Sequence, residues 1–364
     1  MSVSRKFAPL SLLATFGCVG AKLDRLLASL LALSLLFASQ ILARPLHAEA
    51  LFADLLAADR ALGPNAAAFH ALQEGRVDDA ANLLRATLAA NSSDALAHQL
   101  LCRVFYAQDE ADDAIRQCEL AVSTAPVGSD QASDDNLWLG RAYGMKARHA
   151  GPIAGFTLAR KVEASFSRAV ELNPASAAAI NDLGEYYVDA PFVVGGGADR
   201  ARALAARTMP RFPGAAHLLL ARIAVSDNHL AVAESEFKQA IAADRTTDAW
   251  IDLAQFYQIQ ARPDDALAAI KSALAVDRTH GPALVDAASI LTKVNRAPDL
   301  AERCLRDYLA SHAKSDAAPA FKVHLQLAKL LVARKDVPDA NREIAAAAAL
   351  AAAYTRNARS TQGL

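Results

Sequence analysis

Aromatic residues are scarce in this chain of 364 residues, and no familiar catalytic motif is present. Aromatic side chains make up 6% of the residues and hydrophobic residues 53%, and much of the apolar content is alanine. Alanine has the highest intrinsic helix propensity and lets helices approach closely. The composition therefore argues against a β-sandwich, and a charged fraction of 21% argues against wholesale disorder.

Metal-ligand, phosphate-binding and nucleophile patterns are also missing. The nine histidines form no H-E-x-x-H motif, and neither G-x-S-x-G nor G-x-x-x-x-G-K-[ST] occurs. The four cysteines show neither C-x-x-C nor any metal-ligand spacing: Cys18, Cys102, Cys118 and Cys304. The net charge of -1 shows no excess of basic residues of the kind that nucleic-acid binding needs. We therefore expect no cofactor, no metal, no nucleic acid and no enzymatic activity.

The N-terminus has the three parts of an export signal. Basic residues precede an uncharged apolar stretch from Leu26 to Ala43, and Pro45 and the small-residue site Ala48-Glu49-Ala50 follow it. This order predicts a signal peptide over residues 1–50 and a mature chain that begins at Leu51. An uncleaved anchor is the alternative, since eighteen apolar residues approach the ~20 that span a bilayer. Either form places the rest in the periplasm or cell envelope of a bacterium.

A unit of about thirty-four residues recurs along the chain. In the segment 95–126, large and small residues alternate along one expected helix, and the order is reversed along the next. Paired helices need this alternation so that bulky side chains enter gaps left by small ones. The same arrangement returns around the large–small pairs Leu139-Gly140, Leu183-Gly184, Leu220-Ala221, Leu253-Ala254 and Leu327-Ala328, and around Ala287-Ala288, where both residues are small.

The repeated pattern resembles the tetratricopeptide-repeat (TPR) family. The clearest matches are NDLGEYY at residues 181–187 and FSRAVELNP at residues 166–174. The resemblance implies an all-α, right-handed solenoid of about seven to eight helix-turn-helix units over residues 66–353. Residues 51–65 would be a linker or N-terminal cap, and 354–364 a flexible tail. The family's binding of protein partners is implied as well, but the clamp for EEVD-type carboxyl tails is not visible.

Two adjacent units carry insertions between their first and second helices. The extra residues lie within the segments 144–156 and 190–198, and the second contains Phe192 and three glycines. Turns of successive units fall on the same edge of a solenoid, so we expect the two long loops to be neighbours. They would form an edge that binds a partner, two turns that pack on each other, or a cryptic enzyme site.

The first helices should build the concave face. Arg103, Arg141 and Arg222 recur at one position of the repeat, turned away from the seam between the helices. Arginine suits peptide carboxylates, and Trp138 would give an apolar anchor nearby, although a merely solvated face remains the alternative. The candidate partner-binding residues are Arg103, Trp138, Arg141, Asn181, Glu185, Arg222 and Phe192.

Three histidines and a tryptophan share another position of the repeat. His98, His217, His324 and Trp250 each precede the large–small pair of a first helix by three residues, which predicts a packing position for a flat ring. Cys102 and Cys118 lie on the two helices of one hairpin. Pairing Cys102 with residue 114 offsets the cysteines by four residues, ~6 Å, so we expect buried thiols rather than a disulfide.

The sequence therefore predicts an exported scaffold or adaptor that holds a protein partner in its concave groove or along the long-loop edge. An enzyme with a cryptic site at the long loops is one alternative. An assembly subunit that the apolar stretch 26–43 anchors in the membrane is the other.

Overall fold

The structure of the chain is a computed structural model that describes residues 62–126 and 128–362. Over these ranges it contains helices and turns and no β-strand, which confirms the expectation of helix hairpins without a sheet. The export signal, its cleavage site and most of the expected cap at 51–65 lie outside the described residues. Within the described ranges, no helix has the length and apolar character needed to cross a bilayer.

Eight helix pairs follow one another in the described chain, and the helices of each pair pack together. A 3₁₀ turn, η1 (Gly63–Asn65), precedes them, and α19 (Ala352–Gln362) follows them. The pairs are α3 (Ala66–Gln73) with α4 (Val77–Ala90), α5 (Ala95–Ala107) with α6 (Ala111–Thr124), α7 (Asp130–Ala147) with α8 (Pro152–Leu172), α9 (Ala177–Asp189) with α10 (Ala198–Thr208), α11 (Pro213–Ser226) with α12 (Leu230–Asp244), α13 (Thr247–Ile259) with α14 (Pro263–Val276), α15 (Ala283–Lys293) with α16 (Pro298–Ala310), and α17 (Ala320–Ala333) with α18 (Val337–Leu350).

The repeated large–small alternation has the predicted packing role. A Cβ atom at Gly140 in α7 would lie 2.5 Å from the Phe166 ring of α8, so the missing side chain makes room for that ring. Several first helices begin at a residue whose side chain accepts a hydrogen bond from the third following backbone N–H, which stabilises the helix start. These residues are Asp94, Ser129, Ser176 and Thr246.

The C-terminal segment is helical where we expected a flexible tail over residues 354–364. Helix α19 packs against α18, and the ring of Tyr354 lies edge-on to that of Phe321 at a centroid distance of 4.9 Å. Ala351, Thr355 and Ala358 are all buried. Their spacing of four and three residues places them on one face of a helix. This spacing indicates a helix, but we gave more weight to the polar composition of the tail.

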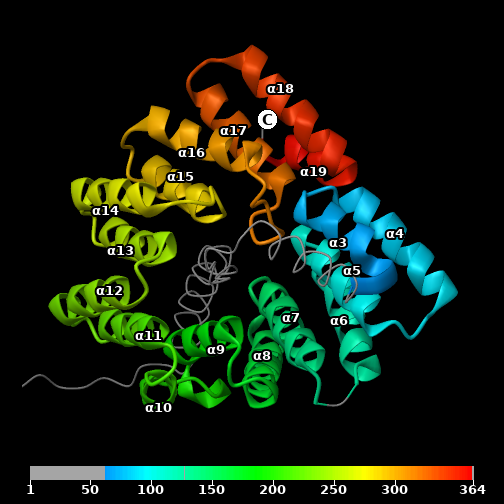
Figure 1. Ribbon diagram of the computed structural model, residues 1–364, viewed down its shortest axis with the longest axis horizontal. Coiled ribbons are helices and arrows are strands. Elements are labelled where there is room, and N and C mark those ends of the chain that lie inside the picture. Colours follow the sequence, from blue (N-terminus) through cyan, green and yellow to red (C-terminus); the bar gives the residue numbers. More distant parts are fainter. Residues whose placement is uncertain (1–61, 127, 363–364) are drawn as a thin grey trace, which may run out of the picture.

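The row of hairpins closes into a ring (Figure 1). Helices α18 and α19 come round to α3 and α4, and the first helices α7, α9, α11, α13 and α15 lie toward the inside. The backbone N–H of Ala352 donates to Asp78 Oδ2 at 2.8 Å. Gly75 has a φ of +79°, and a Cβ there would lie 2.8 Å from the backbone nitrogen of Ala320. Glycine therefore allows both the turn and the close approach of the two ends.

Charged and polar groups join the two ends in what we call the ring seam, formed by Gln73, Asp78, Arg103, Asp109, Asp316, Lys322, Ala352 and Tyr354. Arg103 Nε donates to Asp316 Oδ2 at 2.7 Å and Nη2 donates to Oδ1 at 2.9 Å, while Gln73 donates to Oδ1 at 3.1 Å. Burial opposes ionisation of Asp316, but Arg103, with help from Gln73 and Arg141, holds the pKa of Asp316 below its usual value.

A second ion pair of the ring seam lies nearer the surface. Lys322 Nζ donates to Asp109 Oδ1 at 2.8 Å, and the Tyr354 hydroxyl donates to Oδ2 at 2.9 Å. Apolar packing supports these contacts, since one continuous core cluster contains both Leu72 of α3 and Phe321 of α17. The ends of the solenoid are therefore held by a shared core as well as by charges.

Cys102 and Cys118 form a disulfide with a Cα–Cα distance of 5.3 Å, so the expectation of free thiols was wrong. The error lies in the position of the turn. Helix α5 ends at Ala107 and α6 begins at Ala111, so the turn is centred on Asp109 and Cys102 lies opposite residue 116. The remaining offset is two residues, about 3 Å along the helix axis, which a disulfide spans.

Reduction of this disulfide should destabilise the protein by about 3 kcal/mol, the value typical of a loop of this length. Urea unfolding with and without dithiothreitol measures the change in the free energy of unfolding. The matched control is the Cys102→Ala/Cys118→Ala variant, which should be indifferent to the reductant. Identical unfolding curves of the original chain in both conditions would contradict the bond.

The substitution Asp316→Ala should open the ring seam, because it leaves the Arg103 guanidinium buried without its carboxylate. Removing one partner of a buried pair costs about 3 kcal/mol or more. We expect a lower free energy of unfolding and a larger radius of gyration in small-angle X-ray scattering. Asp199→Ala is the control, since Asp199 is fully exposed in its pair with Arg202 and such pairs contribute about 0–1 kcal/mol. Unchanged scattering and stability would show that the seam does not close the ring.

Candidate functional site

The three arginines of the predicted concave stripe are all engaged within the chain. Arg103 binds Asp316 in the ring seam. Arg141 Nε donates to Asp182 Oδ2 at 2.6 Å, and Arg141 is 8% exposed. Arg222 Nη1 lies 3.8 Å from Glu185 Oε2, and both side chains are nearly buried. The geometry therefore gives the arginines a role in joining repeats, and their contact with a partner stays a prediction.

Trp138 lies between two of these arginines. The guanidinium carbons of Arg103 and Arg141 are 5.0 and 4.6 Å from the centre of the Trp138 ring, and Tyr106 meets it edge-on at 5.5 Å. An arginine over the face of a tryptophan is held by the ring quadrupole. With 9% of its surface exposed, Trp138 spaces the arginines and offers a partner little area. Asn181 in α9 is half-buried.

Several carboxyl groups near the inside of the ring have raised pKa values. Burial is the main cause; it raises the pKa of Glu185 to about 8 and that of Asp189 to about 6, although Arg222 offsets part of both shifts. Burial also raises the pKa values of Asp252 and Asp286 well above their usual range. Carboxyls of this kind serve as acids or bases in enzymes. No group of three or more potential metal ligands occurs within the described ranges.

Asp135 of α7 is another buried carboxyl that sequence reasoning missed. Its side chain is fully buried, and neither carboxylate oxygen has a hydrogen bond of good geometry within the described part of the chain. Burial raises the pKa of Asp135 to about 7; a contact with Gln99 lowers it, and Asp134 raises it further. Ionised Asp135 is therefore a cost to folding at neutral pH.

The first insertion is helix rather than the long loop that we expected over residues 144–156. Helix α7 continues to Ala147 and α8 begins at Pro152, so only four residues connect them. Proline is favoured in the first turn of a helix, where its missing N–H removes no hydrogen bond. Gly151-Pro152 therefore starts the second helix early and lengthens it at its N-terminus.

The second insertion lies beside the lengthened helix, as predicted for neighbouring turns. It forms the 3₁₀ turn η2 (Phe192–Val194), followed by Gly195 at a φ of +97°. The buried Tyr186 hydroxyl lies 2.7 Å from the carbonyl oxygen of Ala159 in α8 and 2.8 Å from that of Val194. One side chain of α9 therefore fixes the two insertions against each other.

Exposed apolar side chains gather on these two insertions, at what we call the long-loop edge, residues 152–156 and 190–198. Ile153 is 88% exposed, Phe156 44%, Phe192 81% and Val193 66%. These are four of the eleven large exposed hydrophobic residues in the described part of the chain. The other seven lie one each on seven other helices. Clustered apolar side chains on a surface mark interaction sites, whereas scattered ones need no explanation.

Basic residues flank the long-loop edge. Arg200 donates to the carbonyl oxygen of Gly195 at 2.9 Å and pairs with Glu163 at 3.2 Å. Burial raises the pKa of Tyr186, and Arg200 and Arg160 lie close enough to offset part of that shift. Of the seven predicted binding residues, Phe192 is thus the only one that lies here. Ile153 and Phe156 were missed, although both are large apolar residues within the first insertion, in the sequence GPIAGF at residues 151–156.

The histidines that share one position of the repeat bond to the second helix of their own hairpin. His98 Nδ1 lies 2.8 Å from Gln117 Oε1. Likewise, His217 Nδ1 lies 2.7 Å from Glu236 Oε2, and His324 Nδ1 lies 2.6 Å from Glu343 Oε2. Each partner is nineteen residues further along the chain. These three histidines therefore have a structural role, as expected for a position that packs a flat ring.

Known proteins share this architecture. The sequence model of the family Tetratricopeptide repeat matches residues 71–133. A thermophilic TPR protein of Thermus thermophilus is 21% identical, with a TM-score of 0.36 over 65% of this chain and 92% of that one. Yeast Tom70 is 14% identical, with a TM-score of 0.50 over 96% of this chain and 73% of that one. A tetratricopeptide repeat protein of Parabacteroides merdae is also 14% identical, with a TM-score of 0.40 over 77% of this chain and 98% of that one. No curated protein matches the chain.

These findings confirm the resemblance on which the sequence analysis relied. The described chain is an all-α solenoid of helix hairpins that closes on itself, and its residues 71–133 match the tetratricopeptide-repeat model. At 14% identity, the likeness to Tom70 shows the fold alone.

Replacing Asp135 with asparagine should stabilise the protein at neutral and alkaline pH. The folded-state pKa lies above the unfolded value, so the cost of ionising Asp135 grows as pH rises from about 4 to about 7 and then stays constant. The variant should gain up to about 4 kcal/mol in free energy of unfolding near pH 8, and almost nothing near pH 4. Urea unfolding across this range measures the gain. Asp264→Asn, at an exposed site, should show no such trend.

Proposed function

We propose that this chain is an exported, non-catalytic scaffold that holds a protein partner through its long-loop edge. The fold supports the general role, because tetratricopeptide repeats are generally scaffolds for protein–protein interaction. The observation that carries the proposal is the cluster of exposed apolar side chains at Ile153, Phe156, Phe192 and Val193. Aromatic residues are enriched at the centre of protein interfaces, and burial of apolar side chains is the main favourable contribution to most protein association.

The inner face of the ring supports a partner less well. Arg103, Arg141 and Arg222, expected to bind an acidic segment, already bind carboxylates of their own chain. A partner there would have to displace Asp316, Asp182 or Glu185 and leave that carboxylate buried without its arginine. Such an exchange gains little, because each new ion pair replaces an existing one.

Export has support from two independent features. The apolar stretch between basic residues and Ala48-Glu49-Ala50 is the pattern of a secretory signal. The Cys102–Cys118 disulfide suits the periplasm or another oxidising compartment, since cytosolic thiols are kept reduced. We propose cleavage after Ala50, with a membrane-anchored subunit as the other form. N-terminal sequencing of the protein from envelope fractions distinguishes them.

Catalysis is the second candidate, and the raised pKa values of Glu185 and Asp189 favour it. General acids and bases work best with pKa values near the ambient pH. Glu185 is 3% exposed and lies against Arg222, so a substrate would have little access to it. We therefore place the scaffold first.

The substitution pair Ile153→Ser/Phe192→Ser should abolish capture of the partner without loss of stability. Removing two apolar anchors of an interface costs about 2 kcal/mol or more each, and exposed residues contribute little to folding. The measurement is affinity capture by the tagged full-length chain in its natural host, with thermal unfolding alongside. Val232→Ser/Ile259→Ser is the matched control, because Val232 and Ile259 are 54% and 56% exposed on other helices.

The inner face supplies the competing outcome. If a folded Arg103→Ala/Arg141→Ala variant loses the partner while Ile153→Ser/Phe192→Ser keeps it, the partner binds inside the ring and the long-loop proposal fails.

A further inference from the structure

The repeat that begins with α13 lacks the hydrogen bond that three other repeats make at the flat-ring position. In α13, Trp250 stands where His98, His217 and His324 stand in other repeats. The residue nineteen positions further on is Ala269, in place of the glutamine or glutamate that those histidines contact. The methyl group of Ala269 cannot make the hydrogen bond that the glutamine or glutamate makes in the other repeats.

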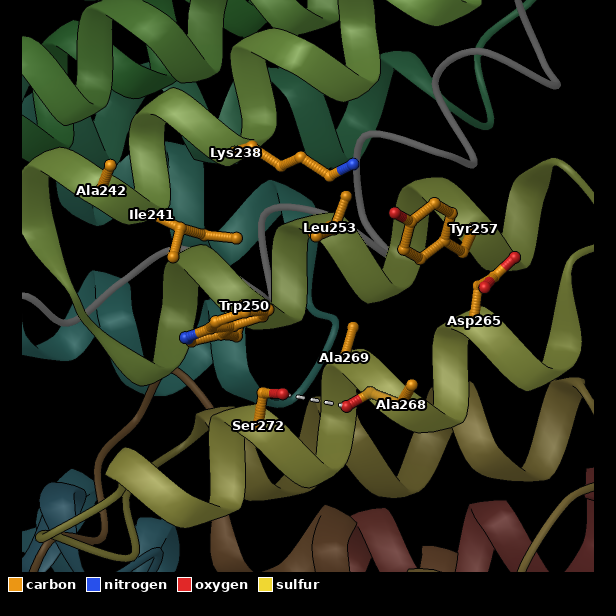
Figure 2. Close-up of a pocket in the computed structure, with 10 residues that line it drawn as sticks. All are labelled: Lys238, Ile241, Ala242, Trp250, Leu253, Tyr257, Asp265, Ala268, Ala269 and Ser272. Carbon is orange, nitrogen blue, oxygen red and sulfur yellow. Dashed lines mark hydrogen bonds between the residues drawn. The ribbon is translucent and has the colours of Figure 1, made fainter.

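An apolar groove of about 400 Å³ lies at this position (Figure 2). Trp250 and Leu253 of α13 form its floor, and the half-buried Trp250 ring lies along it. The second helices α12 and α14 line its sides with small residues, Ala242, Ala268, Ala269 and Ser272, and with the larger Lys238, Ile241 and Asp265. Ligand sites in proteins have volumes of roughly 300–1,000 Å³ and are mostly apolar with a few polar groups. The groove falls within that range.

Two charged side chains line the groove, Lys238 of α12 and Asp265 of α14, and Asp265 is already paired with Arg262 at 2.7 Å. The Lys238 side chain is 59% exposed, and its ammonium donates to Glu234 Oε1 at 2.7 Å. Glu234 also accepts from Arg262 at 2.6 Å and from the Tyr257 hydroxyl at 2.9 Å. It therefore stays paired if Lys238 turns toward a ligand. An ammonium has three donors, so Lys238 can also bind a second carboxylate without releasing the first.

We propose that this groove binds a small aromatic carboxylate. The ring of the ligand stacks on Trp250 between Ala242 and Ala269, and its carboxylate accepts a hydrogen bond from the Lys238 ammonium. Offset stacking on an indole suits one flat ring, and an ion-assisted hydrogen bond fixes its orientation. The site lies on α12, α13 and α14, apart from the long-loop edge, and does not depend on the proposed scaffold function.

The test follows Trp250 in the full-length chain labelled with 5-fluorotryptophan. The sequence contains two tryptophans, Trp138 and Trp250, so two ¹⁹F resonances are expected, and the Trp250→Phe variant assigns them. Titration with 3-phenylpropanoate should shift the Trp250 resonance and leave that of Trp138 in place. The uncharged 3-phenylpropanamide should bind at least about threefold more weakly, and Lys238→Met should remove this preference.

A matched pair of variants separates the groove from nonspecific binding. Ala242→Leu fills the groove from an exposed position and should weaken binding of 3-phenylpropanoate at least about tenfold. Ala243→Leu adds the same side chain at the next exposed residue, which does not line the groove, and should leave binding unchanged. The Trp138 resonance and the unfolding midpoint report on the fold of both variants.

Three results would overturn the proposal. One is the absence of any Trp250 shift up to about 10 mM ligand, which is beyond the millimolar range expected for one ring. Another is equal binding by Ala242→Leu and Ala243→Leu. The third is tighter binding of the blocked peptide acetyl-Asp-Phe-Gly-amide than of 3-phenylpropanoate, which would assign the groove to a segment of a partner protein.

Discussion

The pairing of Arg103 with Asp316 is the contact on which the arrangement of the molecule depends. It joins α5 to the segment before α17, across 213 positions of the sequence, and both side chains are nearly buried. Arg103 also covers one side of Trp138, whose other neighbour is Arg141, which binds Asp182. The seam is thus continuous with the contacts that hold the first helices to each other. Losing it would change both the ends of the solenoid and the surface inside.

The hairpins could be predicted from the sequence because each is a local property. Alternation of large and small residues, as at Gly140 and Phe166, acts between helices close together in the chain. Closure of the ring could not be predicted in this way. It results from summing small rotations between successive repeats, and no pattern near Arg103 indicates a partner as distant as Asp316. The helical tail could have been found from the spacing of Ala351, Thr355 and Ala358.

The candidate functional residues also differ in whether they depend on the local sequence or on contacts with distant repeats. Phe192 was found because an insertion interrupts a strict period, and its exposure follows from lying outside the repeat. The arginines were found as a recurring position, but their role depends on carboxylates that belong to other repeats. The disulfide was missed because the centre of one turn was placed one residue too early, which moved the residue opposite Cys102 by two positions. Raised pKa values could not be inferred at all, since they reflect burial rather than sequence.

Closure gives the repeats a property that open arrays lack. In an open solenoid each terminal repeat has one neighbour, so unravelling begins at the ends and moves inward one interface at a time. Here the contacts between Asp78 and Ala352 and between Asp109 and Lys322 give the outermost helices a neighbour on both sides. Unravelling of any repeat must break two interfaces at once. The ring is therefore expected to behave as a single cooperative unit, in which no repeat serves as the weak point where fraying and proteolysis begin.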